Sequence, residues 1–303
     1  MSKIVVVGSI SMDLVMRTKR IPEGGETIFG DSFNIVPGGK GANQAVAIGR
    51  LSSVEDNIYI FGNVGEDIFS SDLLTNLQDN NISVEHVGTV PQSTGVAQIT
   101  LYGGDNRIIY YPGANNLVRT NDWKNEWELI SDASIVVLQN EIPHEANLSI
   151  AKFCQENQVK VLYNPAPARE TDKEMIPFCD FITPNEHECS ELFPDKKLNE
   201  IIKIYPNKMI VTLGVEGSIY YDGTAVKKIP AIKAEVVDTT GAGDTFNGAF
   251  AYAISKGKEM NVALSFATIA SHLSVQRFGA QGGMPSLKEI KEHSGYEEIW
   301  DFK

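Results

Sequence analysis

A run of β-branched residues near the start of the chain places the strongest constraint on its fold. Residues 4–7 read Ile-Val-Val-Val and end at Gly8, with no polar residue among them. A strand that is apolar at every position has both faces buried, which is typical of a parallel sheet covered by helices on each side. The sequence therefore predicts a parallel sheet at the centre of the molecule.

Further apolar runs recur along the chain, and most are separated by stretches with helical spacing. The strand-like runs are residues 58–61, 135–138, 159–163, 181–183 and 209–213, and the helix-like stretches include 42–51, 68–77 and 143–156. Strands and helices that alternate in this way, joined by right-handed crossovers, predict an α/β fold with a doubly wound, mainly parallel sheet flanked by helices. With 303 residues and 42% apolar side chains, the chain can bury a substantial core. We expect one domain over residues 1–303.

Two regions depart from this alternation. Residues 14–36 and 94–111 look like strand pairs with Gly or Asp-Asn turns, and neither contains a helix that could cover it. We expect them to form a small β-sheet lid or interface over the main domain, built from segments that are distant in sequence. Two ordinary surface hairpins are the alternative.

The most informative stretch is residues 235–250, where a predicted strand leads into a glycine turn and then a helix. The apolar side chains of this helix recur at helical spacing, at Phe246, Phe250 and Ile254. The first amides of a helix lack partners within the helix and carry partial positive charge. The turn is therefore predicted to cradle an anion such as a phosphoryl group in transfer, through Gly241, Ala242 and Gly243.

Asp244 follows this turn directly. An aspartate at that place could simply cap the helix. Beside a phosphate cradle, however, the carboxylate stands where an alcohol must lose its proton while adjacent amides hold the phosphoryl charge. This arrangement predicts that Asp244 acts as a general base.

A second glycine-rich segment, residues 37–45, precedes another predicted helix and carries Lys40 and Asn43. Glycine lets a backbone approach a ligand closely, and Lys40 could reach either a substrate or a phosphate. A flexible turn before a helix is the alternative. Asp13 and Glu141 each follow a predicted strand, and ligands of open α/β sheets bind beyond the carboxyl ends of strands. These polar side chains are predicted to hold several hydroxyls together.

The composition excludes several other classes. The net charge of −13, without a basic stripe, disfavours binding to nucleic acid. There is no GxxxxGK[ST] or GxGxxG motif, which disfavours P-loop ATPases and dinucleotide-dependent dehydrogenases. No early apolar run approaches the roughly 20 residues of a membrane span, so we expect a cytoplasmic protein. The cysteines form no CxxC pair and predict neither disulfides nor a zinc site; they are Cys154, Cys179 and Cys189.

The two glycine segments together resemble the hallmarks of the ribokinase family of carbohydrate kinases, also called the phosphofructokinase-B family. They are GGKGANQA at residues 38–45 and DTTGAGDTF at residues 238–246. Three further segments are similar to the ribokinase branch, at residues 93–97, 113–115 and 164–169. The resemblance runs nearly end to end and implies ATP-dependent phosphorylation of the 5-hydroxyl of D-ribose to ribose 5-phosphate. It also implies a lid that closes on the sugar and a homodimer formed through that lid.

The resemblance further assigns residues to each ligand. Implied sugar contacts come from Ser11, Asp13, Gly39, Lys40, Asn43 and Glu141, with Asp244 as the catalytic base. Implied nucleotide contacts come from Asn185, Thr212, Gly214, Gly217, Gly243 and Thr268. Magnesium and potassium are the implied ions, and Glu188 belongs to the implied magnesium network. The implied potassium site comprises Asp238 and Thr240 together with the backbone near Ser274, Arg277, Gly279 and Gly283. A helix-capping Asn185 and a surface Glu188 are the alternative for those two residues.

One position departs from the family pattern. Many members carry Asn where this chain has Ser11, and serine offers one short hydroxyl in place of a forked amide. The choice between ribose and 2-deoxyribose therefore stays open. Two further hypotheses are a kinase of the same family acting on another sugar or a nucleoside, and a non-catalytic sugar-binding protein. A metal hydrolase is disfavoured, since His187 and Cys189 lie in no HExxH motif.

Overall fold

The computed structural model of the chain describes residues 2–103, 105–121, 123 and 125–302. The strands of its main sheet are Lys3–Val7 (β1), Asn57–Gly65 (β4), Ile82–Ser83 (β5), Val87–Val90 (β6), Ile135–Gln139 (β9), Lys160–Asn164 (β10) and Phe181–Ile182 (β11). Their order is β11-β10-β9-β1-β4-β5, and β6 pairs with the second half of β4. All these pairings are parallel, as predicted.

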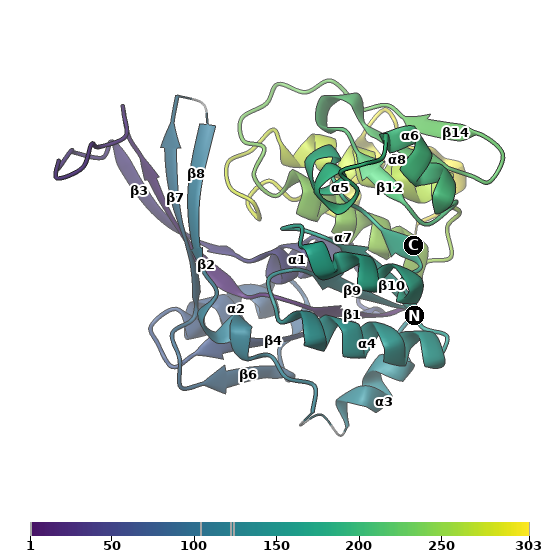
Figure 1. Cartoon of the computed structure of the whole chain (residues 1–303), viewed down its shortest axis with the longest axis horizontal. Coiled ribbons are helices and arrows are strands. Elements are labelled where there is room, and N and C mark those ends of the chain that lie inside the picture. Colours follow the sequence, from purple (N-terminus) through teal and green to yellow (C-terminus); the bar gives the residue numbers. More distant parts are fainter. Residues whose placement is uncertain (1, 104, 122, 124, 303) are drawn as a thin grey trace.

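Helices cover both faces of this sheet (Figure 1). The residues of β1 from Ile4 onward are fully buried and alternate between two hydrophobic cores, with Ile4 and Val6 in one and Val5 and Val7 in the other. The first core includes residues of Lys40–Leu51 (α1), Ser70–Asp79 (α2), Ala242–Ser255 (α7), Met260–Ser274 (α8) and Leu287–Glu292 (α9). The second includes residues of Glu126–Ser131 (α3), His144–Glu156 (α4), Glu186–Leu192 (α5) and Leu198–Ile204 (α6). The predicted doubly wound fold is confirmed.

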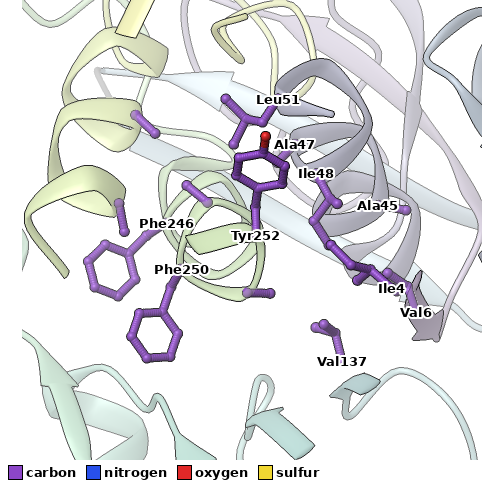
Figure 2. Close-up of a cluster of buried hydrophobic side chains, with 14 of the residues drawn as sticks. Ile4, Val6, Ala45, Ala47, Ile48, Leu51, Val137, Phe246, Phe250 and Tyr252 are labelled. Atoms are coloured by element: carbon purple, nitrogen blue, oxygen red, sulfur yellow. The ribbon is translucent and has the colours of Figure 1, made fainter. Parts of the chain in front are cut away.

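Close packing between α1 and α7 positions the candidate site. A side chain on Gly248 of α7 would lie 2.6 Å from the Cβ of Ala47 and 2.8 Å from the carbonyl oxygen of Gln44, so glycine permits this approach. Figure 2 shows Tyr252 of α7 directed towards α1, near Ala47 and Leu51. The two helices therefore start side by side, which brings polar residues of both first turns together.

The small sheet consists of Ser11–Arg17 (β2), Ser32–Gly38 (β3), Gly95–Tyr102 (β7) and Asp105–Tyr111 (β8), in the order β3-β2-β7-β8. Its outer pairings are antiparallel, whereas β2 and β7 are parallel. The two expected hairpins are thus joined into one sheet, which stands beside the central body (Figure 1). The prediction of a small sheet from distant segments is confirmed.

Two local predictions need correction. Ile210–Thr212 (β12) is a strand, but it pairs antiparallel with Ser218–Tyr221 (β13), which in turn pairs with Val226–Ile229 (β14). Isolated parallel bridges join Met209 to Ile182 of β11 and Thr212 to Asn185. The strand expected before the glycine turn is absent from residues 235–237. The amides of Val237 and Asp238 both donate to the carbonyl of Val275 after α8, so a helix end replaces the strand partner.

None of the helices in the described residues is long and apolar enough to cross a membrane.

Candidate active site

The glycine turn before α7 places a carboxylate and helix amides at one point. Gly241 precedes the helix with a φ of 76°, a left-handed conformation that glycine adopts without strain. A side chain there would also lie 2.8 Å from the Cα of Ala280. Asp244 follows in the first helical turn and is 7% exposed.

The amides of this turn are only partly available to an anion. Ala242 donates to the carbonyl of Thr239 at 3.2 Å. Within the described part of the chain, the amides of Gly243 and Asp244 donate to no other backbone carbonyl, and a side chain on Gly243 would meet nothing within 4 Å. The open part of the cradle is therefore formed by Gly243 and Asp244, whereas Ala242 is already engaged.

The carboxylate of Asp244 is held by side chains of α1. Asn43 Nδ2 donates to its Oδ2 at 2.9 Å, and Gln44 Nε2 donates to its Oδ1 at 3.0 Å. Both oxygens thus accept a hydrogen bond from the neighbouring helix, and within the described residues neither accepts one from an amide of α7. This geometry fixes the carboxylate beside the open amides.

Gln44 was not assigned a role from the sequence, yet its orientation is closely determined. Its Oε1 accepts from Gln139 Nε2 at 2.8 Å, which leaves its Nε2 to donate to Asp244 and, at 3.1 Å, to Asn164 Oδ1. These residues are all buried. Neighbouring residues on a helix point in different directions, so the motif alone did not indicate that Asn43 and Gln44 reach one carboxylate.

Glu141 and Ser9 tie the start of α1 to the ends of β9 and β1. Glu141 Oε2 accepts from the hydroxyl of Ser9 and, at 2.9 Å, from the amide of Lys40. Gly39 lies directly before this amide, as the residue preceding α1. Glu141 therefore satisfies one of the unpaired donors of the helix and stands beside the predicted sugar contacts.

Lys40 faces several acidic groups without forming an ion pair. Burial disfavours its charge, but the nearby carboxylates, foremost Asp244 and Glu141, outweigh this effect and raise the pKa of Lys40 above its ordinary value. Among the described residues, no carboxylate lies within 4.0 Å of its ammonium group. The ammonium is therefore charged and available to an incoming ligand.

Ser11 and Asp13 lie two residues apart on β2, so their side chains share one face of the small sheet. Both are buried, with exposures of 0% and 8%. Burial raises the pKa of Asp13 to about 7, and repulsion from Glu141 and Asp244 adds to this effect while Lys40 opposes it. Asp13 therefore belongs to the same electrostatic cluster as Asp244.

The predicted nucleotide residues come from several elements. Asn185 precedes α5 and forms an isolated parallel bridge with Thr212 at the end of β12. Gly214 and Gly217 bound the turn that follows this strand. Thr268 is buried in α8, one turn before Ser271, whose hydroxyl donates to the carbonyl of Ala242 at 3.1 Å. Thr268 thereby lies on the helix that contacts the cradle.

The capping alternative for Asn185 and Glu188 is present in the structure. Asn185 Oδ1 accepts from the amide of Glu188, and the Glu188 carboxylate accepts from the amide of Asn185, each at 2.8 Å. Glu188 is nevertheless not a bystander at the surface. Burial raises the pKa of Glu188, attraction to Lys40 lowers it, and repulsion from Asp244 raises it. Its carboxylate therefore lies within electrostatic reach of the site.

Several of the predicted potassium residues contact one another. Asp238 accepts from the amide and hydroxyl of Thr240 and, at 2.9 Å, from the amide of Gly279. A side chain on Gly283 would lie 2.1 Å from the carbonyl oxygen of Ser274, so these two backbones touch. The side chain of Arg277 pairs with Glu289 at 2.5 Å, whereas the prediction concerns the backbone near Arg277.

The cysteines and His187 lie apart from the site. All three cysteines are buried and free. His187 lies at the surface beside Glu191. Among the described residues, no group of three or more His, Cys, Asp and Glu side chains could hold a metal ion.

Comparison with known proteins agrees with this geometry. The model of a family described as pfkB family carbohydrate kinase matches residues 1–287. The chain belongs to this family. It is 61% identical over 291 residues to a protein from Lactococcus lactis named ribokinase, covering 96% of both chains. It is 34% identical over 307 residues to a Salmonella typhi protein named deoxyribokinase, covering 97% of this chain and 99% of that one.

A solved structure of Arabidopsis thaliana ribokinase, in complex with ribose and ATP, has the same fold as this pfkB family member. The TM-score is 0.87 at 32% identity, and each chain is covered completely. The protein is an ATP-dependent carbohydrate kinase. For this kinase, the sequence indicated Asp244, Asn43, Lys40, Glu141 and Asp13 as a cluster, and the structure brings them together.

Proposed function

We propose that this kinase transfers the γ-phosphoryl group of ATP to the 5-hydroxyl of D-ribose, with Asp244 as the general base. The observation that carries the proposal is the Asp244 carboxylate, held by Asn43 and Gln44 beside the open start of α7. The similarity to proteins named ribokinase, one of them in complex with ribose and ATP, supports the choice of sugar.

The reaction follows from this arrangement. Asp244 accepts the proton of the 5-hydroxyl as that oxygen bonds to the γ-phosphorus, and the bond between this phosphorus and the β–γ bridging oxygen breaks to release ADP. The amides of Gly243 and Asp244 face the charge that develops on the phosphoryl oxygens. Lys40 adds a positive charge near the same place.

Magnesium would enter this site with the nucleotide. Glu188 suits such a role because its carboxylate reaches the cluster of Lys40 and Asp244 while its own position is fixed by α5. Bound to the phosphates, the ion would neutralise charge on the transferred group.

Potassium also fits the residues assigned to it. Asp238 supplies one carboxylate, which accepts from the amide of Gly279, and the missing side chain of Gly283 lets its backbone meet the carbonyl of Ser274. Hard oxygen ligands with a single negative charge suit a monovalent cation. The proposed ion would stiffen the turn before α7, which begins two residues after Thr240.

We further propose that the small sheet acts as a lid and pairs with the lid of a second copy. Leu14 pairs with both Ile35 and Gln98, and Gln98 pairs with Ile109, so these residues form a row on the face opposite Asp13. Ile35 and Ile109 are 52% and 71% exposed. Exposed apolar rows on a sheet favour pairing with another chain. A cytoplasmic location also stays a prediction.

The test is a substrate panel. ADP formation is measured with ATP, magnesium and potassium against ribose, 2-deoxyribose, fructose and adenosine, and each kcat/KM is compared. We expect ribose to exceed every other acceptor by tenfold or more, and sodium in place of potassium to lower the rate. Activity with none of the acceptors would return the non-catalytic sugar-binding protein to consideration.

The second candidate is a kinase of 2-deoxyribose. It is favoured by the single hydroxyl at Ser11 and by the similarity to a protein named deoxyribokinase. In the same panel it predicts the highest kcat/KM for 2-deoxyribose.

A further inference from the structure

Three polar side chains from three elements meet at the sugar side of the site. They are Ser11 on β2, Tyr110 on β8 and Asn115 in the turn Gly113–Leu117 (η1). Asn115 Nδ2 lies 3.0 Å from Ser11 Oγ and 3.1 Å from Tyr110 Oη, and the two hydroxyl oxygens are 3.4 Å apart. Ser11 and Asn115 are fully buried.

The register of the small sheet directs Tyr110 towards the sugar contacts. Asp13 pairs with Ala97, and Ala97 pairs with Tyr110, so these three side chains form one row on one face. Alanine between them leaves room for the phenol to extend towards Ser11. In the next row, a side chain on Gly95 would lie only 2.3 Å from Asn115 Nδ2 and 2.6 Å from Ser11 Oγ.

The electrostatics of the phenol agree with this placement. Burial raises the pKa of Tyr110 well above its ordinary value, and repulsion from Glu141 and Asp13 contributes to the rise. These two carboxylates belong to the sugar side described above. The phenol therefore keeps its proton at any physiological pH and can donate it.

The hydrogen bonds of Asn115 leave that proton available. Asn115 Oδ1 accepts from the amide of Ile10, and Nδ2 also lies 3.1 Å from the carbonyl of Ile10, which fixes the orientation of the amide. Nδ2 is a donor only and shares its two protons among the oxygens of Ile10, Ser11 and Tyr110, so both hydroxyl oxygens act as acceptors. Each hydroxyl then has its own proton to donate. The contact of 3.4 Å between the two hydroxyls is a long hydrogen bond that would use one of these protons only weakly.

We propose that Tyr110 binds the 2-hydroxyl of the sugar and, with Ser11, distinguishes ribose from 2-deoxyribose. The proposal rests on the proposed function, in which Asp244 faces the 5-hydroxyl. Asp244 is held by Asn43 and Gln44 of α1. Tyr110 instead contacts Ser11 and Asn115, at the end of the site that the small sheet supplies. The 2-hydroxyl is the secondary hydroxyl furthest from C5 along the ring. A phenol supplied by β8 compensates for the short side chain of Ser11.

The test compares Tyr110→Phe with Tyr111→Phe. Tyr111 is the matched control because it neighbours Tyr110 on β8, points to the opposite face and is 50% exposed, with its hydroxyl bonded to Gln92. For each variant, kcat/KM is measured with ribose and 2-deoxyribose, and circular dichroism checks the fold and the unfolding midpoint.

We expect Tyr110→Phe to lower kcat/KM for ribose about tenfold and to change that for 2-deoxyribose less than twofold, since one hydrogen bond to a substrate hydroxyl is lost. Tyr111→Phe should leave both values within twofold of the parent. Equal losses on both sugars, or no loss on ribose, would overturn the proposal. A parent protein that phosphorylates neither sugar would instead refute the proposed function, so the two failures are distinguishable.

Discussion

The central sheet and the small sheet are built from the same kinds of residue but are stabilised very differently. Every residue of β1 from Ile4 to Val7 is fully buried, between one core on each face. In the small sheet, the buried cluster consists of Val15, Ala97 and Ile99, and the opposite face carries exposed apolar side chains. One sheet is covered on both faces, and the other is only partly covered on one.

This difference divides the site into two parts. The first part lies on α1 and α7, which pack on the central sheet. It comprises the base Asp244, the side-chain amides of Asn43 and Gln44 that hold it, and the open backbone amides at the start of α7. Ser11, Asp13 and Tyr110 come from the small sheet. An element with few buried contacts can move at little cost, whereas catalytic groups need fixed geometry. We infer that the part on α1 and α7 is the fixed part and carries the chemistry, whereas the small sheet is the mobile part and adds sugar contacts to those of Lys40, Asn43 and Glu141.

The largest expected effect lies in the fixed part. Asp244→Asn removes the proton acceptor but keeps the shape of the side chain, so kcat should fall roughly 10²- to 10⁴-fold while the affinity for ribose changes little. Steady-state kinetics combined with calorimetric titration of ribose would separate the two quantities. Turnover close to that of the parent would exclude Asp244 as the base.

The sequence could predict the fixed part better than the mobile part. The run from Ile4 to Val7 and the turn before Asp244 are local patterns, because burial on two faces and a glycine at φ of 76° each leave a direct mark on the sequence. The role of Tyr110 leaves no such mark. The position of Tyr110 depends on the pairing of β2 with β7, which are about 80 residues apart in the sequence, and on its contact with Asn115.

The same limit explains the smaller errors. Residues 235–237 have the composition of a strand, but the amides of Val237 and Asp238 donate to Val275 at the end of α8. This depends on tertiary packing rather than on local propensity. Gln44 sits inside a recognised motif, yet its contact with Asp244 required the close approach of α1 and α7 that Gly248 permits.

A matched pair of truncations measures the difference in stability between the two sheets. Ile60 on β4 is fully buried, and Ile109 on β8 is 71% exposed. Ile60→Ala should lower the free energy of unfolding by about 2–5 kcal/mol through lost burial and a cavity, and Ile109→Ala by less than about 0.5 kcal/mol in the monomer. Urea denaturation at low protein concentration tests this. Comparable losses for both variants would show that the small sheet is as firmly packed as the central one.

The smallest expected effect concerns Asp13, where the small sheet meets the carboxylates of the fixed part. The pKa of Asp13 is about 7 in the folded protein, and its reference value, which applies to the unfolded chain, is 3.8. Between pH 3.8 and about 7, the folded state therefore keeps a proton that the unfolded state has lost. The contribution of Asp13 therefore makes the parent less stable as the pH rises from about 4 to about 7, and constant above. The asparagine side chain does not titrate in this range and makes no such contribution.

The measured quantity is the free energy of unfolding of Asp13→Asn minus that of the parent. This difference should be more positive at pH 8 than at pH 5, by on the order of 2 kcal/mol. Urea denaturation of both proteins at pH 5, 6, 7 and 8, with the surface substitution Asp195→Asn as the control for loss of a charge, measures this difference. A constant gain across this range would mean that Asp13 is ionised throughout it in the folded state. In that case nearby groups such as Lys40 would already stabilise the negative charge of Asp13. The small-sheet residues that face the sugar would then be as well preorganised as the base.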